Sequence, residues 1–168
     1  MIYLIGFMGA GKTTIGQQFA LENNLTFIDT DKEIETRNNR KILDIFQKEG
    51  QDYFRELEKE LLISLSENKV VACGGGLPIY NNNMSFIKKS GISIYLKVSV
   101  EELLNRLLNN SNNRPLIKYR SNNNLRNFIQ EEIKKREKFY SMANYTINTS
   151  KLSQEDILRK INSLIFSI

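Results

Sequence analysis

The chain has 168 residues, 40% of them hydrophobic and 26% charged, a mixture typical of one globular domain with a sizeable core. No apolar run approaches the roughly 20 residues of a membrane span, and the single cysteine excludes an intrachain disulfide. The net charge of +5 comes from dispersed basic residues, which favours a small anionic ligand over nucleic acid.

These properties lead us to expect a cytoplasmic protein with no membrane or nucleic-acid partner. The chain contains no histidine, which removes the commonest general base and the commonest zinc ligand. Any catalysis must therefore use carboxylates, lysine, arginine, backbone amides or a metal held by oxygen.

Short apolar runs alternate with longer amphipathic ones, which predicts strands separated by helices. The expected strands are residues 2–5, 25–28, 70–73, 92–96 and 145–147, and the expected helices are 12–23, 30–38, 42–49, 51–66, 99–108, 125–141 and 153–166. This alternation predicts a single α/β domain over residues 1–168, a three-layer sandwich whose five-stranded parallel sheet carries helices on both faces.

The first strand is followed by GFMGAGKTT, residues 6–14, which fits the P-loop pattern G-x4-GK-[ST] between a strand and a helix. Its glycines let backbone amides surround a polyphosphate, and the next helix adds its positive N-terminal end. Lys12 can reach the β- and γ-phosphates of ATP, and the Thr13 hydroxyl can ligate Mg²⁺. The alternative, a plain glycine-rich turn, is disfavoured because motif and flanks agree. The predicted nucleotide contacts are Gly9, Ala10, Gly11, Lys12, Thr13 and Thr14.

The second strand ends in FIDTD, where Asp29 and Asp31 are two residues apart. In an extended chain such residues point to the same side, so both carboxylates can face one cleft. One could hold Mg²⁺ through water, and the other could position or deprotonate a substrate hydroxyl. Capping of the next helix by Thr30 or Asp31 explains the residues equally well at this point.

Arg55 and Arg136 are candidates to bind a substrate carboxylate through their guanidinium forks. Each has a glutamate at helical spacing, Glu58 and Glu132, so a surface ion pair is the competing interpretation. Residues 73–76, CGGG, follow a strand, and three glycines exceed the need of a simple turn, which favours close approach of a ligand. Cys73 is expected to be an inert buried thiol.

Seven asparagines fall within residues 109–124, around Arg114 and Pro115, and this segment reads as a mobile loop. An arginine on such a loop can close over a phosphate as a lid and neutralise charge in the transition state. A solvated loop arginine is the alternative, and it stays open.

In their order along nearly the whole chain, the blocks GFMGAGKTTIG, FIDTD, ILDIFQKEG, YFRELE, GGG, RPL and a late arginine followed by Phe-Tyr resemble the shikimate kinase family. This family belongs to the nucleoside-monophosphate-kinase-like P-loop group. The resemblance implies transfer of the γ-phosphate of ATP, with Mg²⁺, to the 3-hydroxyl of shikimate, a step in aromatic amino-acid synthesis. It also implies a monomer.

The resemblance also assigns roles to single residues. Lys12 would bind the phosphates, Thr13 would ligate Mg²⁺ and Asp29 would support the metal through water. Asp31 would bind the shikimate hydroxyls and accept the proton, which together with Lys12 and Arg114 makes the expected catalytic set. The remaining assignments are Arg55 and Arg136 to the substrate carboxylate, Gly75 and Gly76 to the ring substituents, Phe46, Phe54 and Glu58 to the pocket walls, Arg114 to the lid and Arg106 to the adenine. The substrate-binding helices would span about residues 30–66.

Two departures and three rivals accompany this resemblance. The segment between Arg106 and Arg114 is about a residue longer than in relatives, and residues 148–153, NTSKLS, lack an arginine that many relatives have there. The rivals are a kinase for another anionic polyol such as gluconate, an adenylate kinase, and a nucleotide-binding regulatory module without turnover.

Overall fold

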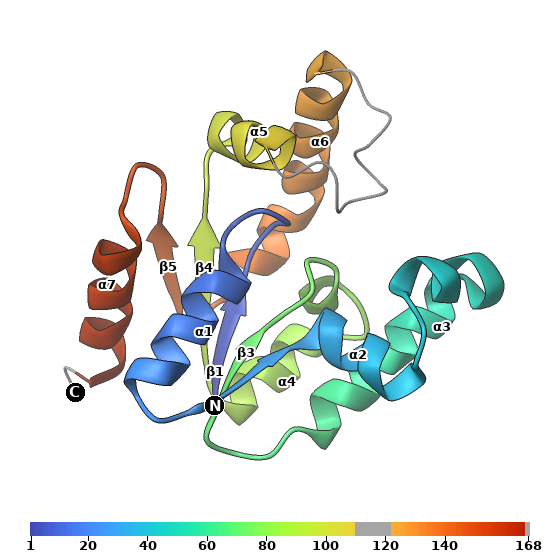
Figure 1. The fold of residues 1–168 in the computed structure, drawn as a ribbon, viewed down its shortest axis with the longest axis horizontal. Coiled ribbons are helices and arrows are strands. Elements are labelled where there is room, and N and C mark those ends of the chain that lie inside the picture. Colours follow the sequence, from blue (N-terminus) through green and yellow to red (C-terminus); the bar gives the residue numbers. More distant parts are fainter. Residues whose placement is uncertain (110–121, 167–168) are drawn as a thin grey trace.

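The computed structural model describes residues 1–109 and 122–166, which form a parallel sheet flanked by helices (Figure 1). The five strands lie in the order β2-β3-β1-β4-β5, and every neighbouring pair is parallel. Their bounds are β1 (Ile2–Ile5), β2 (Thr26–Asp29), β3 (Lys69–Ala72), β4 (Ile92–Lys97) and β5 (Tyr145–Asn148). The α/β fold class predicted from the alternation of apolar and amphipathic runs is confirmed.

Helices cover both faces of this sheet. Their bounds are α1 (Lys12–Glu22), α2 (Thr30–Asn38), α3 (Ile42–Ser64), the short 3₁₀ helix η1 (Leu77–Ile79), α4 (Asn83–Ser90), α5 (Val100–Asn109), α6 (Asn122–Tyr140) and α7 (Gln154–Phe166). α1 and α7 pack on one face of the sheet, and α4 and α6 lie on the other (Figure 1). α2 and α3 extend sideways from the edge strand β2 as an arm.

The burial of the central strand, β1, explains why residues 2–5 form an uninterrupted apolar run. All four residues of β1 are buried, and the register pairs Ile2 with both Val70 and Ile92. A strand with neighbours on both edges and helices on both faces has no solvent-facing side, so apolar residues do not alternate with polar ones. The edge strands β2 and β5 are only partly buried.

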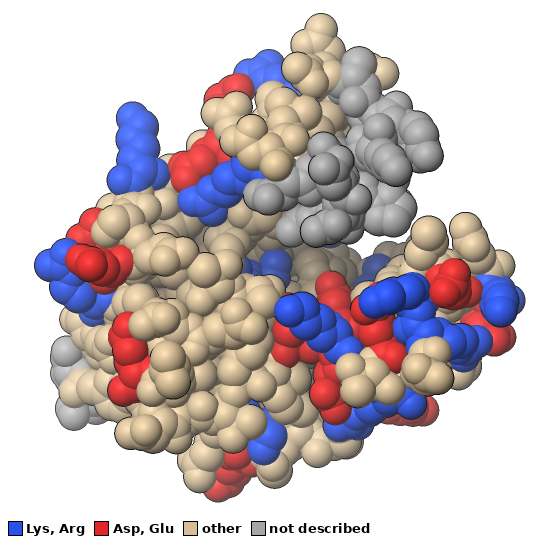
Figure 2. Space-filling view, viewed as in Figure 1, with Lys and Arg blue, Asp and Glu red and all other residues tan. Residues whose placement is uncertain are grey.

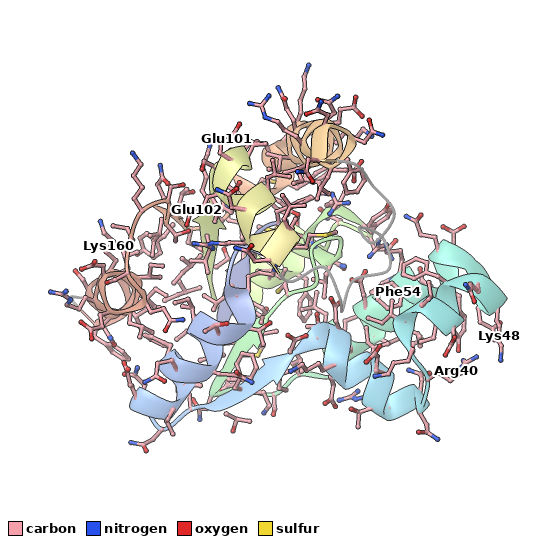
Figure 3. The ribbon with its side chains drawn as sticks, turned by 45° about the horizontal axis from the view of Figure 1, so that its top comes forward. Arg40, Lys48, Phe54, Glu101, Glu102 and Lys160 are labelled. Carbon is pink, nitrogen blue, oxygen red and sulfur yellow. The ribbon has the colours of Figure 1, made fainter. Side chains whose placement is uncertain are left out.

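The arm has its own small core, in which Phe54 packs with Ile34, Ile45 and Leu61. Figure 3 shows Phe54 on the side of α3 that faces the rest of the molecule, with Arg40 and Lys48 on the outer side. α3 consists of two helical parts separated at Gly50, whose φ of 85° and ψ of 178° are not helical, which confirms the two helices expected on either side of residue 50.

η1 and α4 were not predicted. Residues 81–83 are three asparagines, a composition typical of loops, and Asn81 and Asn82 do adopt left-handed conformations with φ 51° and 55°. α4 begins at the third asparagine, Asn83, whose buried side-chain amide donates to the Leu77 carbonyl at 2.9 Å. Across residues 1–109 and 122–166, no helix has the length and apolar character needed to span a bilayer.

Candidate active site

A cavity of about 800 Å³ opens at the carboxyl ends of the parallel strands, where β1 passes into α1. This is the edge at which open α/β sheets bind their ligands. The GFMGAGKTT stretch forms its floor, and Asp29, Asp31, Gly75 and Arg106 also line it. Figure 2 shows the surface hollowed between the part built by α5 and α6 and the arm of α2 and α3.

The loop that precedes α1 has the conformation its glycines permit. Gly9 and Gly11 have φ values of 82° and 92°, in the left-handed region that a side chain disfavours. The Lys12 ammonium donates to the carbonyls of Gly6 at 2.8 Å and Phe7 at 2.9 Å, so it lies over the loop. No described side chain caps the N terminus of α1, and its amide groups and positive dipole end are suited to an anion.

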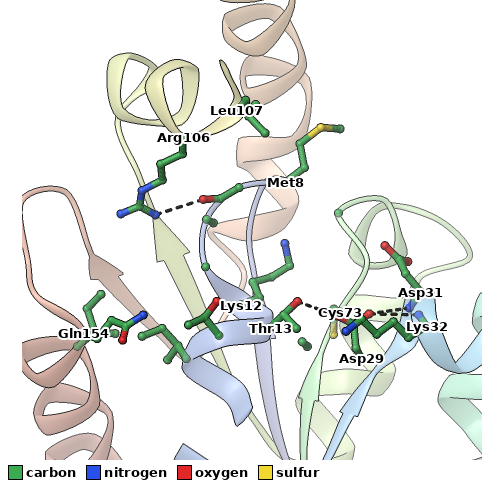
Figure 4. A pocket seen from close by; sticks show the side chains of 18 of the residues that line it. Met8, Lys12, Thr13, Asp29, Asp31, Lys32, Cys73, Arg106, Leu107 and Gln154 are labelled. Atoms are coloured by element: carbon green, nitrogen blue, oxygen red, sulfur yellow. Dashed lines mark hydrogen bonds between the residues drawn. The ribbon is translucent and has the colours of Figure 1, made fainter. Parts of the chain in front are cut away.

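Thr13 and Asp29 meet at the end of this loop (Figure 4). The Thr13 hydroxyl donates to Oδ2 of Asp29 at 2.7 Å. Mg²⁺ is bound in nucleotide sites by one or two oxygen side chains together with phosphates and waters. A hydroxyl and a carboxylate beside a phosphate-binding loop fit that requirement, and among the described residues no group of three acidic, histidine or cysteine side chains offers a full protein cage.

Asp29 also caps α2, by accepting hydrogen bonds from the amides of Asp31 at 3.1 Å and Lys32 at 3.3 Å. The capping alternative, which named Thr30 or Asp31, was therefore wrong about the residue. Thr30 is buried, and its hydroxyl accepts from the amide of Gly74 at 2.8 Å. α2 begins at Thr30, so the extended-chain argument for Asp29 and Asp31 does not apply, although both line the same cavity.

Asp31 is a buried carboxyl group whose pKa is shifted upward. Burial raises its pKa above the ordinary value, and the neighbouring Asp29 carboxylate raises it further. The positive charges of Lys12 and Arg55 oppose this shift without cancelling it. A buried carboxyl between a phosphate loop and an arginine can hold a proton that a substrate hydroxyl releases.

A second cavity, of about 1180 Å³, lies beside the first and contains both predicted arginines, Arg55 and Arg136. Arg55 pairs with Glu58 at 2.5 Å, and the Glu58 side chain is only 1% exposed, so this is not a surface ion pair. The ring of Tyr80 lies 4.3 Å and that of Phe54 lies 5.4 Å from the Arg55 guanidinium carbon. The Arg55 Nε–H is buried without a hydrogen-bond partner among the described groups, a donor that a ligand oxygen would satisfy.

Glu58 carries a perturbed carboxyl because it is so deeply buried. Burial raises the pKa of Glu58 to about 7, although the charge of Arg55 and its hydrogen bond act in the opposite direction. The Asp31 carboxylate adds to the upward shift. Glu58 is thus close to its protonation midpoint at neutral pH.

Arg136 projects from α6 into the same second cavity. It pairs with Glu132 at 2.5 Å, and the two side chains are 18% and 19% exposed. The Phe7 ring of the phosphate loop lies 5.3 Å from its guanidinium carbon. Arg136 therefore lies between its own helix and the phosphate loop. This position connects the second cavity with the first.

Two of the three glycines at residues 74–76 make room for a candidate side chain, and the third lies beside another. A Cβ on Gly74 would collide with the Asp31 carboxylate, and a Cβ on Gly76 would lie 2.6 Å from Nη2 of Arg55. A Cβ on Gly75 would touch Nη1 of Arg136 at 3.4 Å. None of the three is among the glycines with left-handed φ values, so Gly74 and Gly76 are required for space, whereas a Cβ on Gly75 would make only an ordinary contact.

The remaining predicted residues lie around these two cavities. Phe46 lines the second cavity and packs on Phe54 with ring centroids 4.8 Å apart. Thr14 lines the first, and Arg106 lies above the phosphate loop and donates to the Gly9 carbonyl at 3.2 Å (Figure 4). Arg114, and with it most of the expected lid at 109–124, lies outside the described residues.

Sequence reasoning missed several residues of the site. Gln154 lines the first cavity on the side of the phosphate loop away from Asp31 (Figure 4). Tyr80, which follows η1, belongs to no recognised sequence motif. Phe7 was missed because it occupies a position of the P-loop pattern at which any residue is allowed. Cys73 was predicted to be inert, and it is buried with its pKa raised by that burial.

A parallel sheet of this strand order, a phosphate-binding loop after its central strand and a neighbouring cavity with two arginines define the class of protein as a P-loop kinase of a small anionic molecule.

Comparisons with known proteins give the family. The family model described as shikimate kinase matches residues 8–165. The chain is 40% identical over 169 residues to a shikimate kinase of Parabacteroides distasonis, covering 99% of this chain and 98% of the relative. It is 42% identical over 163 residues to that of Azobacteroides pseudotrichonymphae, covering 95% and 96%. The chain belongs to the shikimate kinase family.

Solved structures agree with this membership. The crystal structure of shikimate kinase from Bacteroides thetaiotaomicron has a TM-score of 0.92 at 35% identity, covering 98% of this chain and 97% of that one. Shikimate kinase from Acinetobacter baumannii in complex with shikimate has a TM-score of 0.89 at 38% identity, covering 99% and 92%. A gluconokinase from Sinorhizobium meliloti, at TM-score 0.57 and 15% identity, shares the fold alone.

Proposed function

We propose that this protein transfers the γ-phosphoryl group of ATP to the 3-hydroxyl of shikimate and yields ADP and shikimate 3-phosphate. The observation that carries the proposal is the pair of arginines, Arg55 and Arg136, in one cavity directly beside the phosphate loop. A guanidinium fork matches a carboxylate, and shikimate offers one carboxylate and vicinal hydroxyls. Family membership supports the same substrate.

ATP would occupy the first cavity, with its phosphates on the amides of the phosphate loop and the Lys12 ammonium. Arg106 would face the adenine, and Gln154 on the other side of the cavity is a further candidate for that contact. Thr13 would ligate Mg²⁺ and Asp29 would support it through water, and the bound ion supplies charge neutralisation on the transferred phosphate. These chain groups bind and orient the donor.

Shikimate would occupy the second cavity, with its carboxylate on Arg55 and Arg136 and its ring against Gly75 and Gly76. Its 3-hydroxyl would then face Asp31 and the first cavity. In the transfer, the hydroxyl oxygen bonds to the γ-phosphorus while the bond to the β–γ bridging oxygen breaks, and Asp31 accepts the hydroxyl proton. The raised pKa of Asp31 suits a group that holds this proton.

The test is ADP release by the purified protein with Mg²⁺ and ATP, in the presence of shikimate, gluconate or AMP. We expect ADP release that depends on shikimate and is at background with the other two. Turnover with gluconate and none with shikimate would overturn the substrate assignment. ATP binding without turnover on any acceptor would favour the regulatory module. The monomeric state and cytoplasmic location expected from the sequence stay predictions, and light scattering tests the first.

A further inference from the structure

Tyr140, a buried tyrosine that the site predicted from the sequence did not include, joins one of the substrate arginines to the glycine triplet. Tyr140 is the last residue of α6, fully buried and one helical turn after Arg136. Its hydroxyl donates to the Gly75 carbonyl at 2.7 Å, and the positive charge of the nearby Arg136 lowers the pKa of that hydroxyl, against the effect of burial. The hydroxyl therefore binds the glycine backbone and lies close to the arginine.

The same point lies next to the phosphate loop. A Cβ on Gly75 would lie 3.4 Å from Nη1 of Arg136 and 3.7 Å from the Tyr140 hydroxyl. It would also lie 3.7 Å from the carbonyl of Gly6, the first residue of the loop. That carbonyl accepts from the Lys12 ammonium at 2.8 Å. The Tyr140 hydroxyl thus lies near Gly75, which lines the first cavity, and Arg136, which lines the second.

Two neighbours on α6 fix the direction of Arg136. Glu132, four residues before it, binds Nη2 at 2.5 Å. The Tyr140 hydroxyl, four residues after it, lies near the guanidinium, because both are within 3.7 Å of the point where a Cβ on Gly75 would lie. Burial raises the pKa of Tyr140 to about 12, so its hydroxyl keeps the proton that it donates to Gly75. An arginine whose fork is already oriented loses less freedom when it binds a carboxylate.

We propose that Tyr140 is a positioning residue of the shikimate site, whose hydroxyl holds the Arg136 guanidinium and the Gly75 backbone in the arrangement that binds the substrate. The proposal deepens the function proposed above and rests on it. Tyr140 acts through these two residues and does not itself touch the reacting atoms.

Tyr95 provides a matched control in the same cluster. Its ring centroid lies 5.2 Å from that of Tyr140 with the planes tilted by 46°, and it is 4% exposed. Its hydroxyl donates to Oε2 of Glu137 at 2.8 Å, and Lys97 binds the other oxygen of that carboxylate. Tyr95→Phe and Tyr140→Phe each remove one buried hydroxyl and leave the ring in place.

The experiment compares wild type, Tyr140→Phe and Tyr95→Phe by steady-state kinetics with each substrate varied, alongside thermal unfolding. A hydrogen bond to a charged group is worth about a factor of ten or more. We expect Tyr140→Phe to raise the KM for shikimate about tenfold and to change the KM for ATP less than about twofold. Tyr95→Phe should change either KM by less than about twofold even where its loss of thermal stability is similar.

A double-variant cycle with Arg136→Leu adds a readout that a purely structural role would not move. If Tyr140 acts through Arg136, Tyr140→Phe should have a smaller effect on shikimate KM in that background than in wild type. Additive effects, equal changes in the KM of both substrates, or identical behaviour of the two phenylalanine variants would overturn the proposal. If Tyr140→Phe is unstable at the assay temperature, calorimetric titration of shikimate in the cold makes the same comparison. An inactive wild type would instead reject the proposed function.

Discussion

Replacing Gly76 with alanine tests whether the glycine triplet makes room for the substrate arginine. Gly76 has φ −91° and ψ −25°, a conformation that other residues adopt, so alanine adds no backbone strain. Its Cβ would lie 2.6 Å from Nη2 and 2.7 Å from Cζ of Arg55, whereas ordinary contacts begin at 3.4 Å. Nη1 of Arg55 would lie closer still to this Cβ, so the guanidinium must move by more than the 0.8 Å that separates 2.6 from 3.4 Å.

The surroundings of Arg55 leave little space for that movement. Its guanidinium carbon is 4.3 Å from the Tyr80 ring, and Nη1 is 2.5 Å from the Glu58 carboxylate. Misplacing a binding group by about 1 Å can cost about a hundredfold in rate, and a hydrogen bond to a charged group is worth about 1.5–3 kcal/mol. We expect the KM for shikimate to rise about 10- to 100-fold, with less than about a twofold change for ATP.

The assay is coupled ADP release with one substrate varied at saturating concentration of the other, and thermal unfolding serves as the control for folding. The KM for ATP is the internal reference, because the phosphate loop lies on the other side of the triplet from Arg55. A variant of unchanged stability with the wild-type KM for shikimate would refute the inference that Gly76 is needed for the position of Arg55. Equal increases for both substrates would point instead to a general distortion of the site.

The other predictions concern the phosphate loop and the two buried carboxyls. Lys12→Ala should abolish turnover with the fold intact, and a normal rate would remove the phosphate-loop assignment. Asp31→Asn should lower kcat by on the order of a hundredfold or more, whereas a loss below about threefold would contradict a role as base or positioning group. Glu58 has a higher pKa in the folded state, about 7 against 4.5, so folding favours its protonated form and this stabilisation is lost as the pH rises through that interval. In wild type, the free energy of unfolding should therefore decrease as the pH rises through this interval, and in Glu58→Gln it should decrease less, as measured by urea denaturation at each pH. The same pH dependence in both proteins would contradict the raised pKa of Glu58.

The phosphate loop was predictable because its residues are consecutive in the chain and its function depends on their backbone conformation. GFMGAGKTT lies between a buried strand and an amphipathic helix, and glycine positions with positive φ leave few alternatives. The parallel sheet was predictable for a related reason, because fully buried strands such as β1 are apolar on both faces.

The interpretation of the glycine triplet as a ligand contact stays a prediction, and the structure adds a second reason for glycine at two of its positions. The sequence favoured close approach of a ligand at residues 74–76, and the structure shows in addition that Asp31 and Arg55 occupy the space that side chains at residues 74 and 76 would fill. The sequence gives no spacing rule for such contacts, because they join β3, α2, α3 and α6 across the fold.

The least predictable residues are those that support the site from other elements. Tyr140 lies four residues after Arg136, a spacing that places both on one side of α6, but the Gly75 carbonyl is 65 positions away in the chain. Tyr80 reaches the Arg55 guanidinium from a segment whose asparagines resemble a plain loop. The ion pairs of Arg55 and Arg136 illustrate the same limit, because helical spacing cannot distinguish a buried pair from an exposed one.

The most direct test of the account is to identify the product formed from Mg²⁺, ATP and shikimate by phosphorus and carbon NMR. We predict stoichiometric ADP and a single phosphate ester on the 3-hydroxyl of shikimate, because that hydroxyl would face Asp31 when the carboxylate lies on Arg55 and Arg136. An ester on another hydroxyl would contradict the orientation derived from the two arginines. ADP with inorganic phosphate and unchanged shikimate would contradict the proposed transfer itself.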